Sequence, residues 1–409
     1  MRAAWFLVVV GSTACSSPAV EVPVRAAGRT DVVLQWNEQV AATGGPQLQR
    51  TLAMVHIAMF DAVNAIEPRY QPFLRLAGPP VGTSIDAAAA GAAHGVLTRL
   101  FPDQRQPLAA ALARSLSAVP DGPIEDASVQ YGDAAAQAIY SARFDDRILL
   151  PDTAVPPRPT PGAYQVTAEY EHSINTHARE WVPFALASTS QFRPKGPPAL
   201  TSLEYARELA EVRDIGRLAG TRRSPDQEQI AQWHLEQGQV QINRVARTEA
   251  ATDGRDVLDH ARLFALLNVA IADTVTGVFE AKYTYGFWRP VTAIRRADED
   301  GNTSTEPDVV WSPLRPTPPH PEYPSAHAAV QFAGARILTA HFGPSHAFDT
   351  TSRDVPGASR HYDNFEAFAK EGGESRILAG VQFRTSVNDG RTMGERIGDW
   401  VLEHCFARK

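Results

Sequence analysis

The chain has 409 residues, of which 44% are hydrophobic and 21% are charged, the composition of an ordinary globular protein. Its formal net charge of −7 argues against a nucleic-acid-binding protein, because such proteins normally present a basic surface. Its two cysteines, Cys15 and Cys405, are too few for a cysteine-clustered zinc or iron–sulfur site.

The first 20 residues have the pattern of an export signal or lipoprotein leader. Met1 and Arg2 precede an apolar run over residues 3–10, and small residues then lead to Cys15. The apolar run is too short to span a bilayer as a mature helix. We therefore expect an exported protein that is periplasmic, secreted, or an outer-membrane lipoprotein. A lipid on Cys15 would be its only membrane contact.

Residues 30–150 are predicted to form a first helical half. The segment 48–66 is apolar on most of its circumference, which indicates a buried helix. Residues 84–100 are rich in alanine, and further helices are expected at residues 105–118 and 125–139. Almost no run alternates with a period of two, so the sequence predicts an all-α fold.

A proline-rich connector over residues 151–198 is expected to join this half to a second helical half over residues 199–409. The proline-dense segment 151–162 cannot be helical. Residues 298–321 are predicted to form a long loop, and loops of that length usually carry function. The helices expected in the second half cover residues 201–218, 225–240, 257–279, 326–340, 365–378 and 390–405.

Lys282 and Arg289 form the first of three polar clusters in the second half. They are seven residues apart, so on a continuous helix they would share a face. Pro290 would then end or kink that helix. Taken alone, the two side chains are more simply explained as solvent-exposed cations.

The second cluster is Pro324-Ser325-Ala326-His327, which has the pattern of a helix start with Ser325 as the N-cap. The simpler interpretation is that Ser325 caps the helix and His327 packs against it. The functional interpretation is that the hydroxyl and the free amides bind an anion, and that His327 moves protons to or from it.

The third cluster contains Ser375, Arg376, Gly380 and Gln382 near the end of a predicted helix. Alone, Arg376 would be explained as a cation that stabilises a helix C-terminus. All three clusters lie next to helix boundaries, however, and together they supply the donors that a tetrahedral oxyanion needs. We therefore predict that they form one oxyanion pocket.

The three clusters resemble the motifs of the vanadium-dependent haloperoxidases and the related type-2 phosphatidic acid phosphatases. Those motifs read Lys-x6-Arg-Pro, Pro-Ser-Gly-His and Ser-Arg-x3-Gly-x-His, and this chain has FEAKYTYGFWRP, HPEYPSAH and SRILAGVQF. The segments LAMVHIAMFDAVNAI, WRPVTAIRRADEDGN and TPPHPEYPSAH are similar to the bacterial haloperoxidase-like branch, so the resemblance covers nearly all of the chain after the leader.

The resemblance implies a helical bundle that holds vanadate, or phosphate in the same site. It implies that three cations neutralise the oxygens of the anion: Lys282, Arg289 and Arg376. Ser325 and the amide of Ala326 would donate hydrogen bonds, and His327 would be the catalytic acid–base residue that deprotonates hydrogen peroxide.

The resemblance also bears on the halide that would be oxidised. His320 stands where bromoperoxidases of the family tend to carry histidine and chloroperoxidases carry phenylalanine, which favours bromide. Phe279 falls where these enzymes often place a tryptophan near the anion. Small anions, halide and hydrogen peroxide are therefore the expected partners, while the sequence does not indicate an oligomeric state.

Two positions depart from the family pattern. Ala326 replaces the usual glycine but keeps its backbone N–H. Gln382 replaces the histidine that coordinates vanadium in the peroxidases and attacks phosphorus in the phosphatases, and Ser386 stands where an aspartate usually orients that histidine. No direct side-chain bond to the metal is therefore expected. His346 and His361 remain open as replacements.

These observations predict an enzyme of the haloperoxidase type that holds vanadate mainly by charge and hydrogen bonds. A non-catalytic oxyanion-binding homologue is the alternative that Gln382 favours. A phosphatase that uses water instead of a histidine nucleophile is a third hypothesis, because an amide is no nucleophile.

Overall fold

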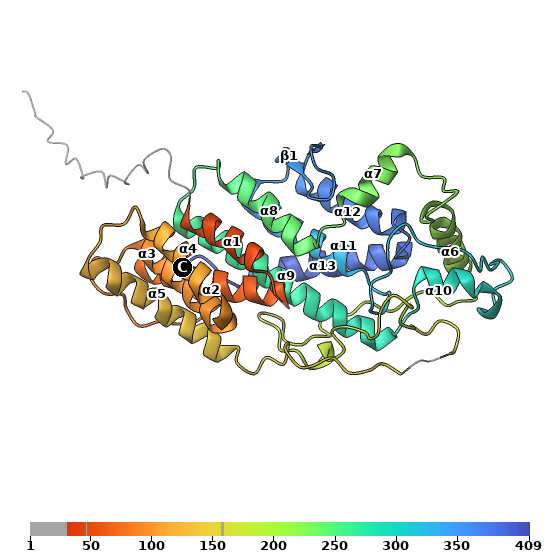
Figure 1. The fold of residues 1–409 in the computed structure, drawn as a ribbon, viewed down its shortest axis with the longest axis horizontal. Helices are drawn as coiled ribbons and strands as arrows, with labels where there is room; N and C mark the ends of the chain where they lie inside the picture. Colours follow the sequence, from red (N-terminus) through yellow and green to blue (C-terminus); the bar gives the residue numbers. More distant parts are fainter. Residues whose placement is uncertain (1–30, 46, 157–158) are drawn as a thin grey trace, which may run out of the picture. The chain divides into compact units, whose positions relative to one another are not determined.

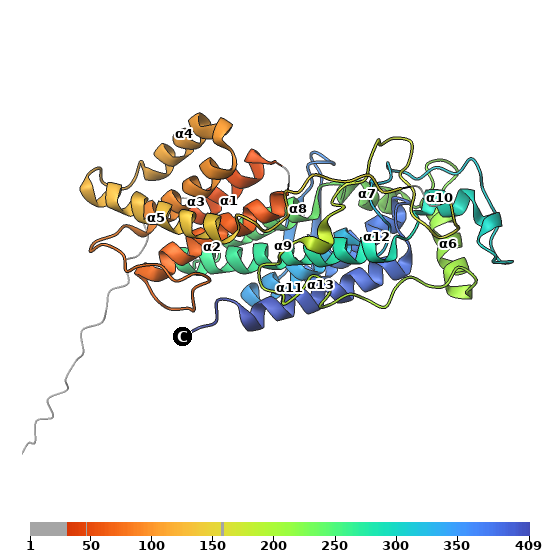
Figure 2. The same cartoon turned by 90° about the horizontal axis from the view of Figure 1, so that it is seen from below.

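The computed structural model describes residues 31–45, 47–156 and 159–409, so the predicted leader and Cys15 lie outside the described residues. Within them the chain is mostly helical, as predicted, and Figures 1 and 2 show the arrangement. The first five α-helices are α1 (Val32–Thr43), α2 (Leu48–Ile66), α3 (Ile85–Leu100), α4 (Arg105–Leu116) and α5 (Pro123–Ala142).

Residues 151–198, apart from the undescribed 157 and 158, contain one short 3₁₀ turn, η2 (Ala178–Glu180), and otherwise follow an irregular path. Two further 3₁₀ turns are η1 (Pro102–Gln104) and η3 (Ala297–Glu299). The helices that follow the connector are α6 (Leu203–Ile215), α7 (Pro225–Trp233), α8 (Gly238–Ala250), α9 (Val257–Tyr285), α10 (Pro290–Arg295), α11 (Ala326–Phe342), α12 (Phe365–Leu378) and α13 (Arg384–His404).

One small β-structure departs from the predicted all-α fold. Strands β1 (Phe348–Thr351) and β2 (Ser359–Tyr362) form an antiparallel pair in which Phe348 lies opposite Tyr362. Phe348 also stacks on Phe365, with ring centroids 4.9 Å apart, so the pair covers the start of α12. Four-residue strands are too short for their alternation to stand out in a sequence.

The helix predicted over residues 225–240 is wrong in one respect, because the chain breaks there. α7 ends at Trp233, and α8 starts at Gly238 and continues to Ala250. A Cβ atom at Gly238 would lie 3.2 Å from Val330 and 3.7 Å from Nδ1 of His327. The break therefore brings a glycine close against α11, and it leaves the backbone carbonyl of His234 free of helical hydrogen bonds.

α9 is the central helix of residues 31–409, which form one compact unit by their contacts. It packs on α2 at one end and on α11 and α13 at the other (Figure 1). It is the one helix in the described ranges that is long and apolar enough to cross a bilayer, but its most apolar window is entirely buried, as in a core helix. Whether the chain divides into two halves at the connector stays a prediction.

α11 and α13 pack closely because α13 carries glycines on the side that faces α11. A Cβ atom at Gly394 would lie 2.1 Å from the carbonyl oxygen of Ala329, and one at Gly390 would lie 2.5 Å from that of Ser325. Both separations are shorter than any real carbon–oxygen contact. The glycines therefore fix how near α13 lies to Ser325, the residue that starts α11.

Candidate oxyanion site

Lys282 lies in the last turn of α9 and is fully buried. Its Nζ donates hydrogen bonds to the carbonyl oxygens of Pro321, at 2.9 Å, and Glu322, at 2.8 Å. Burial, reinforced by the charge of Arg289, holds the pKa of Lys282 well below its usual range. The last turn of a helix favours a cation, which offsets part of the cost of this burial.

Arg289 does not share a helix with Lys282, contrary to the expectation for a continuous helix. α9 ends at Gly286, which adopts a left-handed conformation (φ 56°) and donates its N–H to the carbonyl of Lys282. Arg289 is instead the N-cap residue of α10, and Pro290 begins that helix rather than ending α9. The two cations still lie near each other, because the turn at Gly286 folds Arg289 back.

The guanidinium of Arg289 is buried and connects two of the clusters. Its Nε donates to the carbonyl of His320 at 2.9 Å, and its Nη1 donates to the carbonyl of Val381 at 2.9 Å. Burial lowers the pKa of Arg289 to about 10, while the Glu322 carboxylate acts in the opposite direction. Arg289 thus contacts the loop before Ser325 and the residue that precedes Gln382.

Ser325 is the N-cap of α11, as predicted. Its Oγ accepts a hydrogen bond from the N–H of Ala328 at 3.2 Å, and its hydroxyl donates to Oε1 of Gln382 at 2.6 Å. Its own N–H donates to the carbonyl of Ser386 at 2.9 Å. Ala326, the first residue of the helix, is partly exposed.

His327 follows on the first turn of α11, and its Nε2 is inaccessible to solvent and has no hydrogen-bond partner among the described residues. Burial, the charge of Arg376 and the nearby ring of His234 hold the pKa of His327 well below its usual range. The ring centroids of His234 and His327 are 6.3 Å apart. The imidazole of His327 is therefore neutral in the anion-free protein, and an anion bound beside it would favour its protonation.

Arg376 lies in the last turn of α12, and its donors are turned toward α7. Its Nε donates to Oγ of Ser375 at 3.0 Å, and its Nη2 donates to the carbonyl of His234. Burial, then the charges of Arg289 and Arg315, lowers the pKa of Arg376 to about 10. The first and third clusters meet at Val381, whose carbonyl accepts from Arg289 and whose N–H donates to the carbonyl of Arg376 at 3.1 Å.

Gln382 is buried between the second cluster and α13. Its Oε1 accepts from Ser325, and its Nε2 donates to the carbonyl of Glu322 at 3.2 Å and approaches Oγ of Ser386 at 3.5 Å. The amide is therefore held in one orientation by its neighbours. An amide nitrogen has no free lone pair, so this side chain does not supply the donor that an imidazole would offer a metal.

The two residues predicted to tune halide choice lie together beside Arg289. The rings of Phe279 and His320 are 4.9 Å apart, and Nη2 of Arg289 lies 3.0 Å from Nδ1 of His320. Burial and the charges of Arg289 and Lys282 hold the pKa of His320 well below its usual range. His320 is therefore a neutral ring next to two cations.

His346 and His361, which the sequence left open as replacement ligands, are engaged elsewhere. Nε2 of His346 lies 2.8 Å from a carboxylate oxygen of Glu249, and His361 is exposed on β2 with its Nδ1 3.3 Å from Asp349. A histidine outside the three motifs that does lie next to the pocket is His234, which accepts from Arg376. It contributes through its backbone carbonyl, which no sequence motif reveals.

The three cations differ from other buried arginines because no carboxylate of the described residues lies within 4.0 Å of their nitrogens. By contrast, Arg50 pairs with Asp146 at 2.5 Å and Arg223 pairs with Glu228 at 2.8 Å. Buried charges in proteins are normally paired. A cluster of three that meets carbonyl oxygens instead is suited to an incoming anion, and the donor set fits vanadate or phosphate held by charge and hydrogen bonds.

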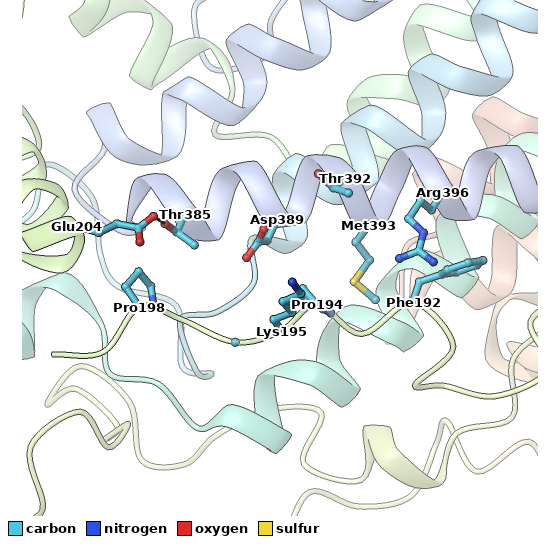
Figure 3. A pocket seen from close by; sticks show the side chains of 11 residues that line it. Phe192, Pro194, Lys195, Pro198, Glu204, Thr385, Asp389, Thr392, Met393 and Arg396 are labelled. Atoms are coloured by element: carbon cyan, nitrogen blue, oxygen red, sulfur yellow. Dashed lines mark hydrogen bonds between the residues drawn. The ribbon is translucent and has the colours of Figure 1, made fainter. Parts of the chain in front are cut away.

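A surface groove of about 370 Å³ lies on another side of α13, between that helix and residues 192–198 of the connector (Figure 3). Asp389, on its wall, accepts a hydrogen bond from the hydroxyl of Tyr323, two residues before Ser325. None of the residues predicted for the oxyanion site lines this groove. The groove is therefore distinct from the cation cluster.

The fold is a helical bundle, and the chain is homologous to the vanadium haloperoxidases. Residues 262–408 match the family model described as the VCPO second helical-bundle domain. Lys282, Arg289, Ser325, His327, Arg376 and Gln382 all lie within that match.

Particular relatives agree with this assignment. The chain is 28% identical over 377 residues to the vanadium chloroperoxidase of Curvularia inaequalis; the match covers 72% of this chain and 60% of the length of that protein. A crystal structure described as the first bacterial vanadium-dependent iodoperoxidase superposes with a TM-score of 0.79 at 25% identity, covering 91% of this chain and 95% of the other. The holo form of a bacterial vanadium-dependent chloroperoxidase has a TM-score of 0.70 at 20% identity, covering 92% and 96%.

Proposed function

We propose that this protein is an exported, haloperoxidase-like enzyme that holds vanadate by charge and hydrogen bonds and oxidises halide with hydrogen peroxide. The observation that carries the proposal is that Lys282, Arg289 and Arg376 donate to main-chain carbonyls and have no ion-pair partner among the described residues. The relatives that bind vanadium support the choice of vanadate over other oxyanions. Phosphate has the same shape and would occupy the same site.

The residues divide the work by their chemistry. Lys282, Arg289 and Arg376 would neutralise the oxygens of the anion, and Ser325 would turn its hydroxyl from Gln382 toward it. Bound vanadate supplies the activation of peroxide for halide oxidation. His327, neutral and with Nε2 unpartnered, would take the proton that peroxide gives up on binding.

Bromide is the halide that we propose. His320 and Phe279 form one wall beside Arg289, and a histidine at the position of His320 is the feature that the resemblance associates with bromide oxidation. A neutral imidazole next to two cations also leaves local positive charge available to attract a halide ion.

The test compares the wild type with Gln382→His and with the double variant Gln382→His/Ser386→Asp. Each protein is titrated with vanadate, and bromination of a phenol dye with hydrogen peroxide is followed. Since the loss of supporting ligands typically costs about 10–100-fold in metal affinity, the histidine variants are expected to bind vanadate at least that much more tightly. Gln137→His, at an exposed position of α5, controls for the addition of a histidine.

Turnover by the wild type supports the proposal. If the wild type neither binds vanadate nor turns over while a histidine variant does both, the native chain is not a peroxidase. A non-catalytic oxyanion-binding function is the second candidate, because the Gln382 amide is fixed by Ser325 and Glu322 and presents no metal donor. A large phosphate-induced shift of the melting temperature without bromination or phosphomonoester hydrolysis would establish it.

A further inference from the structure

Glu322 is the one carboxylate near the first two cations of the oxyanion pocket whose charge influences both of them. It lies between the loop that ends at Pro321 and the motif that starts α11, and its side chain is fully buried. Its Oε1 accepts the N–H of Phe383 at 2.9 Å, at the start of α13. Its Oε2 is also buried but has no hydrogen-bond partner among the described residues.

The backbone of Glu322 joins all three clusters of the pocket. Its carbonyl oxygen accepts from Nζ of Lys282 at 2.8 Å, from Nε2 of Gln382 at 3.2 Å and from Oγ of Ser386 at 3.4 Å. The side chain is thus fixed at both ends, by Phe383 and by its own backbone. These contacts hold Glu322 beside Lys282.

Two cations and one carboxylate interact electrostatically with Glu322, and its charge contributes to the raised pKa of that carboxylate, Glu208. Arg289 and Lys282 both favour its ionised form, while burial opposes ionisation and raises its pKa overall. In turn, the Glu322 charge supports the protonated forms of Lys282 and Arg289 against their own burial.

We propose that the Glu322 carboxylate is the internal counter-charge of the pocket, which stabilises Lys282 and Arg289 in the anion-free protein and competes with the anion for them. The inference rests on the proposed oxyanion function and adds a residue that sets the strength of binding. Glu322 acts through the two cations, so it is a positioning and affinity-setting residue rather than a catalytic one.

The test separates charge from geometry with two substitutions. Glu322→Gln keeps an oxygen for the N–H of Phe383 but removes the charge, whereas Glu322→Asp keeps the charge but is too short to preserve that hydrogen bond. Phosphate binding is measured by calorimetry, and the melting temperature is measured without phosphate and with it. Asp61→Asn is the control, because Asp61, on α2, is also buried and accepts backbone N–H groups, those of Phe73 and Leu74 at 2.8 Å.

We expect Glu322→Gln to bind phosphate about 10-fold or more tightly than the wild type, because a fixed buried negative charge near the anion is removed. The same variant should melt at a lower temperature without phosphate, since the cations lose their counter-charge. A merely structural role would lower both stability and affinity. Glu322→Asp should keep affinity near that of the wild type, and Asp61→Asn should lose stability without tighter binding.

Equal or weaker phosphate binding by Glu322→Gln, with binding by the wild type intact, overturns the inference and leaves the proposed function standing. Absence of phosphate and vanadate binding in both proteins overturns the proposed function and the inference together. If Glu322→Gln is recovered as folded protein only in the presence of phosphate, that dependence supports the inference.

Discussion

The three cations of the pocket donate hydrogen bonds to main-chain oxygens rather than to acidic side chains. Lys282 meets two carbonyl groups, Arg289 meets those of His320 and Val381, and Arg376 meets that of His234. Carbonyl dipoles satisfy the N–H donors but leave the net charge in place. The pocket therefore keeps its positive field, which a direct carboxylate pair would cancel.

The first prediction concerns the protonation state of a single residue, His327. In the anion-free protein its imidazole should stay neutral between about pH 5 and 8, where an ordinary histidine titrates, because burial and the charge of Arg376 disfavour its protonation. Phosphate should raise its pKa, since a nearby anion favours the imidazolium. Proton–nitrogen NMR of the histidine side chains measures both, with His327→Gln used to assign the signal. Titration near pH 6.5 without an anion would contradict the prediction.

At the scale of elements, the site depends on the contact between α11 and α13. Ser325 and His327 come from the first helix, and Gln382 directly precedes the second. Gly390 and Gly394 allow the two backbones to approach until a methyl group would no longer fit. The geometry between Ser325 and Gln382 is thus set by residues that carry no functional group.

Gly394→Ala tests this dependence. The added methyl group would collide with the Ala329 carbonyl, so α13 must shift, and overpacking of this kind typically costs about 1–3 kcal/mol of stability. The shift should also weaken phosphate binding. Chemical denaturation and calorimetry measure the two effects. Gly78→Ala is the control, because nothing lies within 4 Å of a Cβ atom there. Unchanged stability in Gly394→Ala would show that the contact between α11 and α13 tolerates the added methyl group, contrary to the prediction.

Most helices could be predicted from the sequence because their apolar periodicity and caps are local. Ser325, for example, caps α11 as its position before an alanine-rich run indicates. The break between α7 and α8 could not be predicted, because the approach of Gly238 to Val330 is a tertiary contact. The candidate site residues were identified from the spacing of three clusters and their resemblance to family motifs, and their roles stay a prediction. His234 and Glu322 were missed because a backbone carbonyl has no residue signature and Glu322 has no counterpart in the motifs.

At the scale of the whole described unit, distant segments are joined by a buried group of histidines and aspartates. Nδ1 of His260, on α9, lies 3.0 Å from Asp31 before α1, and its Nε2 lies 3.0 Å from Asp253 after α8. His341, at the end of α11, reaches the other oxygen of Asp253 at 3.1 Å. Burial disfavours a charged His260, but the two carboxylates outweigh it and raise its pKa above the ordinary 6.5.

This arrangement predicts a pH-dependent contribution to stability. Because the folded-state pKa of His260 is raised, its contribution is fully present below about pH 6.5 and is lost as the pH rises through the folded-state value. The difference in unfolding free energy between the wild type and His260→Gln should therefore shrink from about pH 6 to pH 9. Urea denaturation at several pH values measures it. A difference that is constant or grows with pH would contradict this assignment.

The hydrogen bond between Ser325 and Gln382 also has a kinetic consequence. A serine hydroxyl has one proton, and here it is directed at the amide oxygen of Gln382, while the amide nitrogen is tied to the Glu322 carbonyl. An entering anion must accept this hydrogen bond in place of Gln382. The amide oxygen repels the anion until the Gln382 side chain turns away. Association is therefore coupled to a local rearrangement and should be slower than diffusion allows. This contact should therefore affect the exchange rate of the anion as well as its affinity.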